Sequence, residues 1–250
     1  MTDLLPRPAP QLFPDLTTGH VRVAAAGTQF GRIYAQTGAH PGLWDQLRTF
    51  GPTGARFDHH LPPPREQPDR AVLYAAIGTA ADPTPTGGGD PPDPDLDQDD
   101  LFPRPPGPGP AQRPPRLLYT CVAEVFHDRG VLELSRDSPA FVLFRTVRPV
   151  ALLDLSDSDW VAQAGGNAAL TAGRHDTARA WARAIHDRYP DLNGLVYSAA
   201  TMPAARSVVL TERARTALPP RPVLNLPLTA PVLRAELEDY GHRLHLPLLT

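Results

Sequence analysis

Five polar side chains interrupt segments of the sequence that are otherwise apolar: Arg32, Arg56, Tyr74, Glu124 and Ser198. A charge inside an apolar segment is costly to bury unless it is paired or faces a polar cleft. The two arginines and the glutamate could form a buried ion-pair network. They could also line an anion-binding cleft, in which the guanidinium groups fork onto phosphates and the carboxylate faces a sugar.

The composition excludes several kinds of catalytic and binding site. The chain has 250 residues, a formal net charge of −3 and 24 basic residues, all of them arginine. Without lysine, the chain cannot use Schiff-base catalysis, a Walker-type phosphate loop or a lysine general base. Its one cysteine, Cys121, cannot build a disulfide framework or a cysteine-based zinc site within one chain. The balanced charge argues against a protein that coats nucleic-acid phosphates.

Several common motifs are incomplete. The aspartates of residues 93–97 begin like a calcium loop, but Gln98 and Arg104 stand where that loop needs a glycine and a bidentate glutamate. His59 and His60 lack further ligands at metal spacing, which favours a loop over a metal site. No G-x-S-x-G elbow surrounds any serine, which counts against an α/β-hydrolase. We therefore expect no metal.

Short apolar or alternating runs bounded by glycine, proline or aspartate predict β-strands. We expect a strand leading into a helix over residues 116–130, with Thr120 as the N-cap. Apolar residues at helical spacing predict helices within 157–166, 175–190 and 232–240. The pattern indicates a β-rich α+β fold with few helices. The expected strands lie at 20–26, 31–35, 54–60, 71–78, 192–200 and 207–214, with two more within 141–155 that are joined near Pro149.

Prolines divide the chain. Residues 82–115 hold 12 prolines, 7 aspartates and 5 glycines. Such a stretch buries too little to offset an ordering cost of about 1–2 kcal/mol per residue, so we expect a mobile insert within one domain or a linker between two. Residues 1–18 form a second proline-rich tail, and residues 219–231 are expected to be irregular. No apolar run approaches the roughly 18–20 residues that span a bilayer, and we expect a soluble, cytoplasmic protein.

Six motifs, in chain order, resemble the RES domain: G-R-I-Y, G-A-R-F-D, V-L-Y-A-A, T-C-V-A-E-V-F, L-L-D-L and N-G-L-V-Y-S. The resemblance runs over residues 20–214, and the fourth and sixth motifs are the most specific. RES proteins resemble ADP-ribosyltransferases in fold and are typically toxins of bacterial toxin–antitoxin pairs that degrade NAD by hydrolysis or phosphorolysis. Their antitoxins carry an Xre-like helix-turn-helix and a segment that plugs the active site.

The resemblance implies a role for each of the five polar residues. Arg32 and Arg56 would hold the NAD phosphates, and Tyr74 would stack on or hydrogen-bond to the nicotinamide half. Glu124 would hydrogen-bond to the nicotinamide ribose and stabilise the oxocarbenium-like charge of the transition state. Ser198 would position ribose or nicotinamide and would not act as a nucleophile. The implied catalytic residues are Glu124, Arg32 and Tyr74.

The chain departs from the family pattern at two places. It has G-A-R-F-D-H where the family usually shows G-G-R-F/W-N-P, which leaves the shape of that loop open. Some members place a serine at the start of the helix before the last core strands, where this chain has residues 174–177. His175 or Asp176 could take the place of that serine in binding, although a helix N-terminus explains the aspartate equally well.

The resemblance therefore implies an ADP-ribosyltransferase-like, β-rich α+β core interrupted by a disordered insert. We expect a tail at 1–18, a RES-like catalytic domain at 19–216 and an extension with a short helix at 217–250. The expected activity is cleavage of the nicotinamide–ribose bond of NAD, with water or inorganic phosphate as acceptor and an Xre-like antitoxin as partner. We expect neither nucleic acid nor membrane to bind directly. The alternatives are a protein ADP-ribosyltransferase, and a degenerate scaffold that binds a nucleotide or a protein partner without catalysis.

Overall fold

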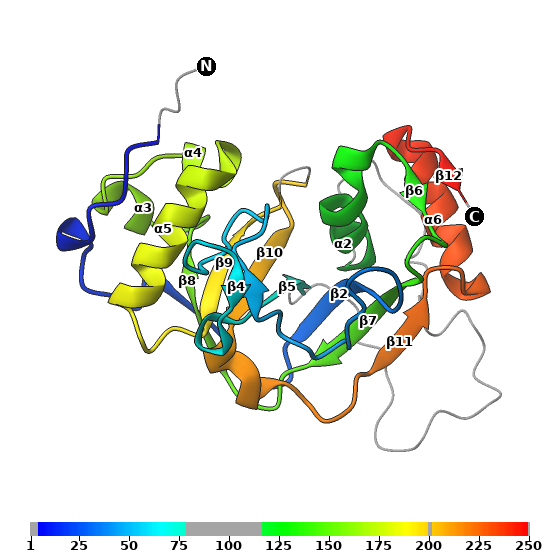
Figure 1. Ribbon diagram of the computed structural model, residues 1–250, viewed down its shortest axis with the longest axis horizontal. Helices are drawn as coiled ribbons and strands as arrows, with labels where there is room; N and C mark the ends of the chain where they lie inside the picture. The colour runs from blue at the N-terminus through cyan, green and yellow to red at the C-terminus, as the bar shows by residue number, and fades with distance from the viewer. Residues whose placement is uncertain (1–4, 79–116, 200–201, 250) are drawn as a thin grey trace, which may run out of the picture.

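One large sheet organises the molecule (Figure 1). The computed structural model describes residues 5–78, 117–199 and 202–249. It combines this sheet with a few helices, which confirms the predicted α+β class. The insert expected at 82–115 lies outside the described residues. Within the described residues, no helix has the length and apolar character needed to cross a membrane.

The large sheet has eight strands in the order β1-β8-β9-β10-β5-β2-β7-β11. Neighbouring strands are antiparallel, except that β8 and β9 are parallel. The strands are β1 (Val21–Ala24), β2 (Gln29–Ala35), β5 (Val72–Ile77), β7 (Pro139–Arg145), β8 (Val150–Asp154), β9 (Gly194–Ser198), β10 (Arg206–Thr211) and β11 (Leu224–Pro227). Two small sheets pair β3 (Phe50–Gly51) with β4 (Arg65–Glu66) and β6 (Leu132–Glu133) with β12 (Leu248–Leu249).

The helices form two groups on the sheet. Figure 1 shows α3 (Trp160–Gln163), α4 (Ala169–Ala172) and α5 (His175–Arg188) beside β8 and β9. It shows α2 (Leu117–Phe126) and α6 (Pro231–Leu244) on the side of β2 and β7. The 3₁₀ helices are η1 (Pro10–Leu12), η2 (Pro68–Arg70), η3 (His127–Arg129) and η4 (Glu212–Ala217).

Alternation along β5 separates the two faces of the sheet. Leu73, Ala75 and Ile77 point into a core on one face, while Val72 and Tyr74 join the core beneath α5 on the other. Successive side chains of a strand point to opposite faces, so this pattern follows directly from the sequence V-L-Y-A-A-I. The face that carries Tyr74 is therefore the face covered by the helices.

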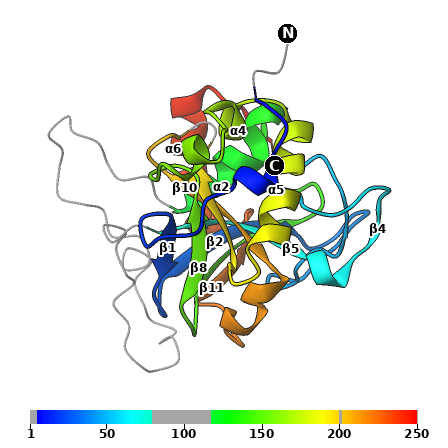
Figure 2. The ribbon, with the colours of Figure 1, turned by 90° about the vertical axis from the view of Figure 1, so that its left-hand side faces the viewer.

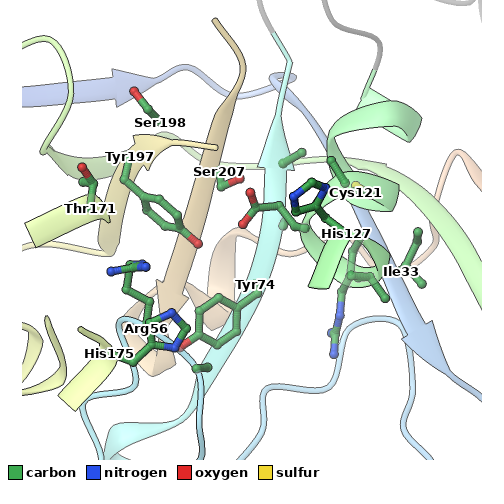
Figure 3. A pocket seen from close by; sticks show the side chains of 17 residues that line it. Ile33, Arg56, Tyr74, Cys121, His127, Thr171, His175, Tyr197, Ser198 and Ser207 are labelled. Carbon is green, nitrogen blue, oxygen red and sulfur yellow. The ribbon is translucent and has the colours of Figure 1, made fainter. Parts of the chain in front are cut away.

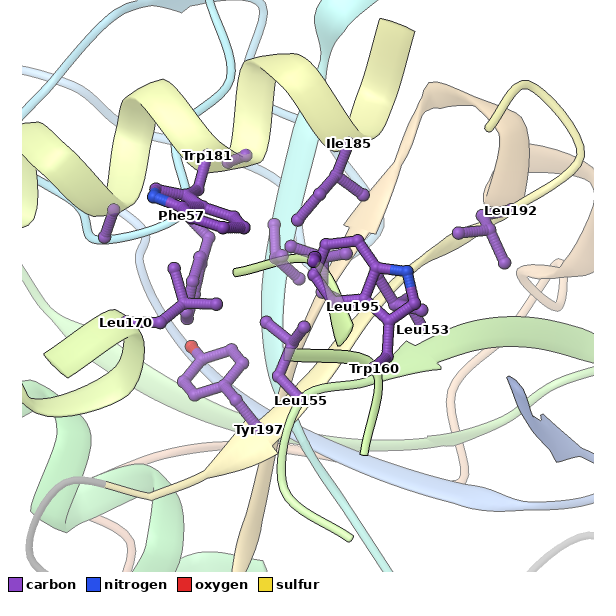
Figure 4. Close-up of a cluster of buried hydrophobic side chains, with 14 of the residues drawn as sticks. Phe57, Leu153, Leu155, Trp160, Leu170, Trp181, Ile185, Leu192, Leu195 and Tyr197 are labelled. Atoms are coloured by element: carbon purple, nitrogen blue, oxygen red, sulfur yellow. The ribbon is translucent and has the colours of Figure 1, made fainter. Parts of the chain in front are cut away.

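The core beneath α5 is rich in tryptophan (Figure 4). Trp181 and Ile185 of α5 pack with Trp160 against Leu153 and Leu195 of the sheet. These α5 residues stand four apart and so share one face of the helix. This packing fixes α5, and with it the helix N-terminus at His175, relative to β8 and β9.

The N-terminal segment packs against α5 (Figure 2). Phe13 is 5% exposed and stacks on Trp181 with ring centroids 5.5 Å apart. Trp181 Nε1 donates to the Pro6 carbonyl at 2.8 Å, and the Tyr189 hydroxyl donates to the Pro14 carbonyl at 2.6 Å. At the other end of the chain, β11 pairs with β7, so the irregular structure expected over 219–231 is wrong at those four residues. The division of the chain at residues 18 and 216 stays a prediction.

Two local predictions are also wrong. Residues 54–60 form turns and irregular structure, because the Asp58 carboxylate accepts hydrogen bonds from the backbone N–H groups of Thr53 and His60 and curls the chain around itself. Thr120 lies inside α2, which is already helical at Leu117. Nearly every residue of this helix is buried, so its apolar run has the continuous hydrophobicity that also marks a buried strand. The other predicted strands and helices are present.

Candidate active site

A cavity of about 420 Å³ opens on the helical face, between α2 on one side and the start of α5 on the other (Figure 3). Its floor comes from β5, β9 and β10. All six residues that the sequence singled out contact it: Arg32, Arg56, Tyr74, Glu124, His175 and Ser198. The volume lies in the range of small-molecule sites, which is about 300–1,000 Å³. The fold thus brings together side chains from six separate segments of the chain.

Arg56 and His175 form one wall of the cavity, next to Tyr74 (Figure 3). Arg56 Nη1 donates to the Gly173 carbonyl at 2.7 Å, and His175 Nδ1 donates to the Gly54 carbonyl at 2.7 Å. These two bonds cross-link the loop that carries Arg56 to the N-terminus of α5. The guanidinium is therefore held at the wall by the helix that it faces.

The same loop is anchored from below by Asp58, whose side chain is fully buried. Its Oδ2 accepts from Arg48 Nη2 at 2.9 Å and from Thr53 N at 2.6 Å, and its Oδ1 lies 2.5 Å from His60 Nδ1. Charge-assisted bonds of this kind are among the stronger ones in proteins. Asp58 thus has a structural role of its own, since it shapes the loop that presents Arg56.

Tyr74 and Ser207 lie on the floor of the cavity. Both hydroxyls are buried, and neither has a hydrogen-bond partner within the described part of the chain. Burial raises the pKa of Tyr74 well above its ordinary value, and the charge of Asp58 adds to the rise. Neither hydroxyl therefore has surface open to the cavity, and the rest of each side chain lines the floor.

Tyr197 points its ring into the space between Arg56 and the opposite wall (Figure 3). The ring packs on Phe57 with centroids 4.6 Å apart. Burial raises the pKa of Tyr197 well above its ordinary value; the charge of Glu124 adds to this rise, and that of Arg56 opposes it. The pKa of Tyr197 is thus affected by a carboxylate on one wall of the cavity and by a guanidinium on the other.

Helix α2 supplies the opposite wall, with Glu124, Cys121 and then His127 just beyond its end. The helix lies close to β2 because Gly31 has no side chain: a Cβ there would stand 3.2 Å from Leu117 Cβ and 3.3 Å from Cys121 Sγ. This close approach sets the height of Glu124 above the sheet. Glu124 itself is exposed, as a carboxylate that receives a ligand from solution must be.

Arg32 lies at the margin of the cavity. It is the first residue of β2 beyond the two that pair with β5. Its Nη1 donates to the carbonyl oxygens of Trp44 at 2.9 Å and Gln46 at 3.1 Å. Burial lowers the pKa of Arg32 to about 10, so the group is charged at neutral pH. Its hydrogen bonds clamp the loop at residues 44–46, and a role in phosphate binding stays a prediction.

Ser198 reaches the cavity at its far end, away from Tyr74 (Figure 3). Its hydroxyl lies 3.2 Å from the hydroxyl of Ser156. Ser198 follows Tyr197 on β9, and adjacent residues of a strand point to opposite faces. Ser207 is paired with Tyr197 across β9 and β10 and shares its face. The serine at the centre of the floor is therefore Ser207.

Four polar residues that line the cavity were not predicted from the sequence: His127, Thr171, Tyr197 and Ser207. One signal was present for Tyr197, because N-G-L-V-Y-S alternates and places the tyrosine opposite Ser198. Ser207 begins an apolar strand and had the same kind of signal as the polar residues that were singled out. His127 and Thr171 lie outside regular strands, so no periodicity marks them.

The walls and floor carry complementary chemistry. Arg56 offers a cation at one wall, Glu124 an anion at the other, and the tyrosines an aromatic surface between them. Guanidinium groups bind phosphates, and carboxylates accept hydrogen bonds from sugar hydroxyls. The arrangement suits a ligand that carries phosphate at one end and a polyhydroxylated, flat group at the other.

A comparison with protein-family models agrees with the motif pattern. The family model described as the RES domain matches residues 117–229. Among solved structures, the chain is similar to one chain in the crystal structure of the M. tuberculosis MbcT-MbcA toxin-antitoxin complex. That similarity has 16% sequence identity and a TM-score of 0.46, and it covers 87% of this chain and 92% of the other. No match is found among the curated proteins.

Proposed function

Because residues 117–229 match the family model of the RES domain, we propose that the chain is an NAD-consuming enzyme whose active site is the cavity between α2 and α5. The matched span includes Glu124, Tyr197 and Ser207, while Arg56 and Tyr74 come from the part of the chain before it. The observation that carries the proposal is the opposition of Glu124 and Arg56 across two tyrosines. The proposed catalytic domain is residues 19–216.

The reaction that we propose is cleavage of the bond between nicotinamide and ribose. The electron pair of that bond goes to the pyridinium nitrogen, which leaves as neutral nicotinamide and needs no protein acid. Positive charge then develops on the ribose. The Glu124 carboxylate opposes this charge and accepts a hydrogen bond from a ribose hydroxyl, so it stabilises the transition state more than the ground state.

The remaining residues bind and orient the substrate in this proposal. Arg56 pairs with the pyrophosphate, and the family resemblance gives Arg32 the same role once its carbonyl contacts are exchanged. Tyr74 and Tyr197 enclose the nicotinamide half, and Ser207 lies on the floor beneath it. Ser198 and His175 line the ends of the site. Water or inorganic phosphate attacks the sugar carbon and loses a proton to solvent.

The direct test is release of nicotinamide from NAD by the purified chain, with and without phosphate, followed by chromatography. We expect Glu124→Gln to lower kcat by roughly 100-fold or more with little change in KM, because the carboxylate acts mainly in the transition state. Glu238→Gln is the matched control, since Glu238 pairs with Arg234 on α6 away from the cavity. It should leave kcat unchanged.

Arg56→Gln separates binding from catalysis. Loss of one charge-assisted bond of about 1.5–3 kcal/mol should raise KM for NAD by roughly 10- to 100-fold, with a smaller effect on kcat. Equal turnover by Glu124→Gln and wild type would contradict the catalytic assignment. NAD binding without turnover in the wild type would favour a nucleotide-binding scaffold. Transfer of label from NAD to a protein would identify an ADP-ribosyltransferase.

We also propose a protein partner of the antitoxin type, because RES proteins typically pair with an Xre-like antitoxin that plugs the active site. A gene for a small helix-turn-helix protein next to the gene for this chain would support this pairing. Its product should inhibit nicotinamide release when it is mixed with the enzyme in equimolar amounts. Undiminished release in the presence of excess product would contradict the pairing.

A further inference from the structure

A second cluster of chemistry-bearing side chains lies outside the proposed active site. His59 follows the Arg56 loop, His186 lies near the end of α5, and Glu212 opens η4 directly after β10 (Figure 1 shows α5 and β10). None of the three lines the cavity of about 420 Å³. In the sequence, His59 has no partner at metal spacing, and the fold brings the other two residues to it.

The three side chains converge on one point. His186 Nε2 lies 3.0 Å from Glu212 Oε1, and His59 Nε2 lies 3.8 Å from Glu212 Oε2. One ligand atom from each residue falls within 4.8 Å of the other two. The imidazole rings are stacked with centroids 4.2 Å apart and planes inclined by 20°. Ligand atoms bonded to zinc at 2.0–2.2 Å in a tetrahedron stand about 3.4 Å apart, so the observed separations bracket the required one.

Two atoms of the cluster lack partners. His59 Nε2 and Glu212 Oε2 are both buried, and neither forms a hydrogen bond with any part of the chain that the structure describes. The His59 side chain is only 3% exposed. Their separation of 3.8 Å is too long for a hydrogen bond between them. A buried nitrogen and a buried carboxylate oxygen that face each other without a proton bridge can both be satisfied by a cation placed between them.

The neighbouring charges are compatible with a cation between His59 and Glu212. Arg213 Nε lies 3.3 Å from Glu212 Oε1, whereas the unpartnered atom is Oε2, so coordination through Oε2 leaves that ion pair in place. On the other side of the His186 ring, Asp187 Oδ1 and Arg213 Nη2 each lie 3.5 Å from Nδ1. A carboxylate beyond the second ring nitrogen is the usual outer partner of a metal-bound histidine, because it orients the ring.

Space for a water molecule lies beside the two histidines. A cavity of about 20 Å³ is lined by His59, His186 and Arg213 among others, but not by Glu212. One water needs roughly 10–15 Å³ of such space. Two imidazoles, one carboxylate and one water form a donor set typical of zinc.

We propose that His59, His186 and Glu212 bind one zinc ion, with a water molecule in the fourth position. The ion would tie the loop at residues 56–60 to α5 and to η4. Its role is structural, because it fixes the segment that also carries Arg56 into the active site. The inference does not depend on NAD being the substrate, since it rests on a separate set of side chains.

The experiment uses the full chain without an affinity tag, stripped with EDTA and dialysed. Zinc chloride is titrated by calorimetry, and thermal unfolding is recorded with and without one equivalent of zinc. The wild type should bind one zinc per chain and unfold several degrees higher with the ion. Cobalt chloride should give the visible absorption of a four-coordinate site. His186→Ala and Glu212→Gln should each weaken zinc binding by roughly 100-fold or more, while His242→Ala on α6 should not change it.

Circular dichroism establishes that each variant is folded before titration, and Glu212→Gln is the variant that keeps the shape of the side chain. Zinc uptake by the wild type that equals uptake by Glu212→Gln and His186→Ala would overturn the proposal. So would a melting temperature that zinc does not change. Loss of binding in both variants, with the His242→Ala control unaffected, would establish the site.

Discussion

The buried carboxylate of Asp58 gives the sharpest test of how the active-site loop is built. Asp58→Asn keeps the size of the side chain and removes its charge. Oδ2 accepts from Arg48 Nη2, Thr53 N and Thr53 Oγ1, and Oδ1 meets Nδ1 and the backbone N–H of His60. An asparagine can present its oxygen to only one of these two groups of donors. Its amino group then faces donors on the other side.

The expected loss follows from these contacts. In its better orientation the asparagine keeps the three bonds at Oδ2 and loses the two at Oδ1. Hydrogen bonds to charged groups contribute about 1.5–3 kcal/mol each, so the loss of two should lower the free energy of unfolding by about 3–6 kcal/mol. Arg48 keeps its hydrogen bond at Oδ2 and is 31% exposed, so the loss of the opposite charge adds less than the rupture of a fully buried ion pair would.

Urea unfolding at pH 7, followed by circular dichroism and tryptophan fluorescence, measures the change. The control is Glu238→Gln, because Glu238 is half exposed and forms an i,i+4 pair with Arg234. That substitution should cost only about 0.3–0.5 kcal/mol. A loss below about 1 kcal/mol for Asp58→Asn would refute the reasoning, since it would mean that the carboxylate is not held as described.

The pH dependence gives an independent check. Burial alone would raise the pKa of Asp58, but hydrogen bonds from His60 and Thr53 and the charge of Arg48 lower it well below its ordinary value of 3.8. The folded state therefore binds this proton more weakly than the unfolded chain does. The stabilisation is complete above the unfolded pKa and is lost as the pH falls toward the folded pKa. The gap between wild type and Asp58→Asn should shrink below about pH 4, and a constant gap would contradict the mechanism.

Three further predictions concern the core. Phe13→Ala should lower the free energy of unfolding by about 3–5 kcal/mol, since the ring is buried among tryptophans. Leu12 is 62% exposed, so Leu12→Ala should lower it by less than about 0.5 kcal/mol. Similar urea midpoints for the two variants would be contrary evidence. Burial raises the pKa of the Cys121 thiol to about 12. Iodoacetamide should therefore label this thiol at pH 8 only after denaturation. Rapid labelling of the native chain would disprove the burial of Cys121. Gly194→Ala should lower the free energy of unfolding by at least about 3 kcal/mol, because its Cβ would lie 2.1 Å from the Val209 carbonyl oxygen. A Cβ at Gly54 meets open space, so Gly54→Ala should change that free energy by under about 1 kcal/mol. Equal thermal midpoints for the two variants would contradict the packing.

Much of the fold could be predicted from periodicity. The strands that alternate, such as β5 and β9, and the helix with tryptophan and isoleucine on one face, α5, follow from residue spacing alone. The start of α2 could not be predicted, because its residues are buried on nearly all sides and no polar face marks it as a helix. The turn around Asp58 could not be predicted either, since its shape depends on Arg48 from a neighbouring segment.

The site was predictable to the extent that its residues interrupt apolar strands. Arg56, Tyr74 and Glu124 meet in one cavity as that criterion suggested. A polar residue within an apolar strand does not reveal which face of the sheet it lies on when the strand ends or twists. For this reason Ser198 was predicted for the site, whereas Ser207 takes the central position and Ser198 lies beside Ser156. The criterion also cannot see contacts made by a neighbouring loop, such as the two carbonyl oxygens that Arg32 binds.

The position of β10 in the sheet has a consequence for the order in which the molecule assembles. Tyr74 reaches the cavity from β5 and Tyr197 from β9, and the strand that joins these two is β10, which pairs with both. The floor therefore cannot close until residue 211 has been synthesised and has left the ribosome. Such pairing between distant segments slows folding, because the entropy of closing long loops must be overcome before any contact forms. A nascent chain thus carries no complete cavity, and any activity of this site begins only with the release of a nearly full-length molecule.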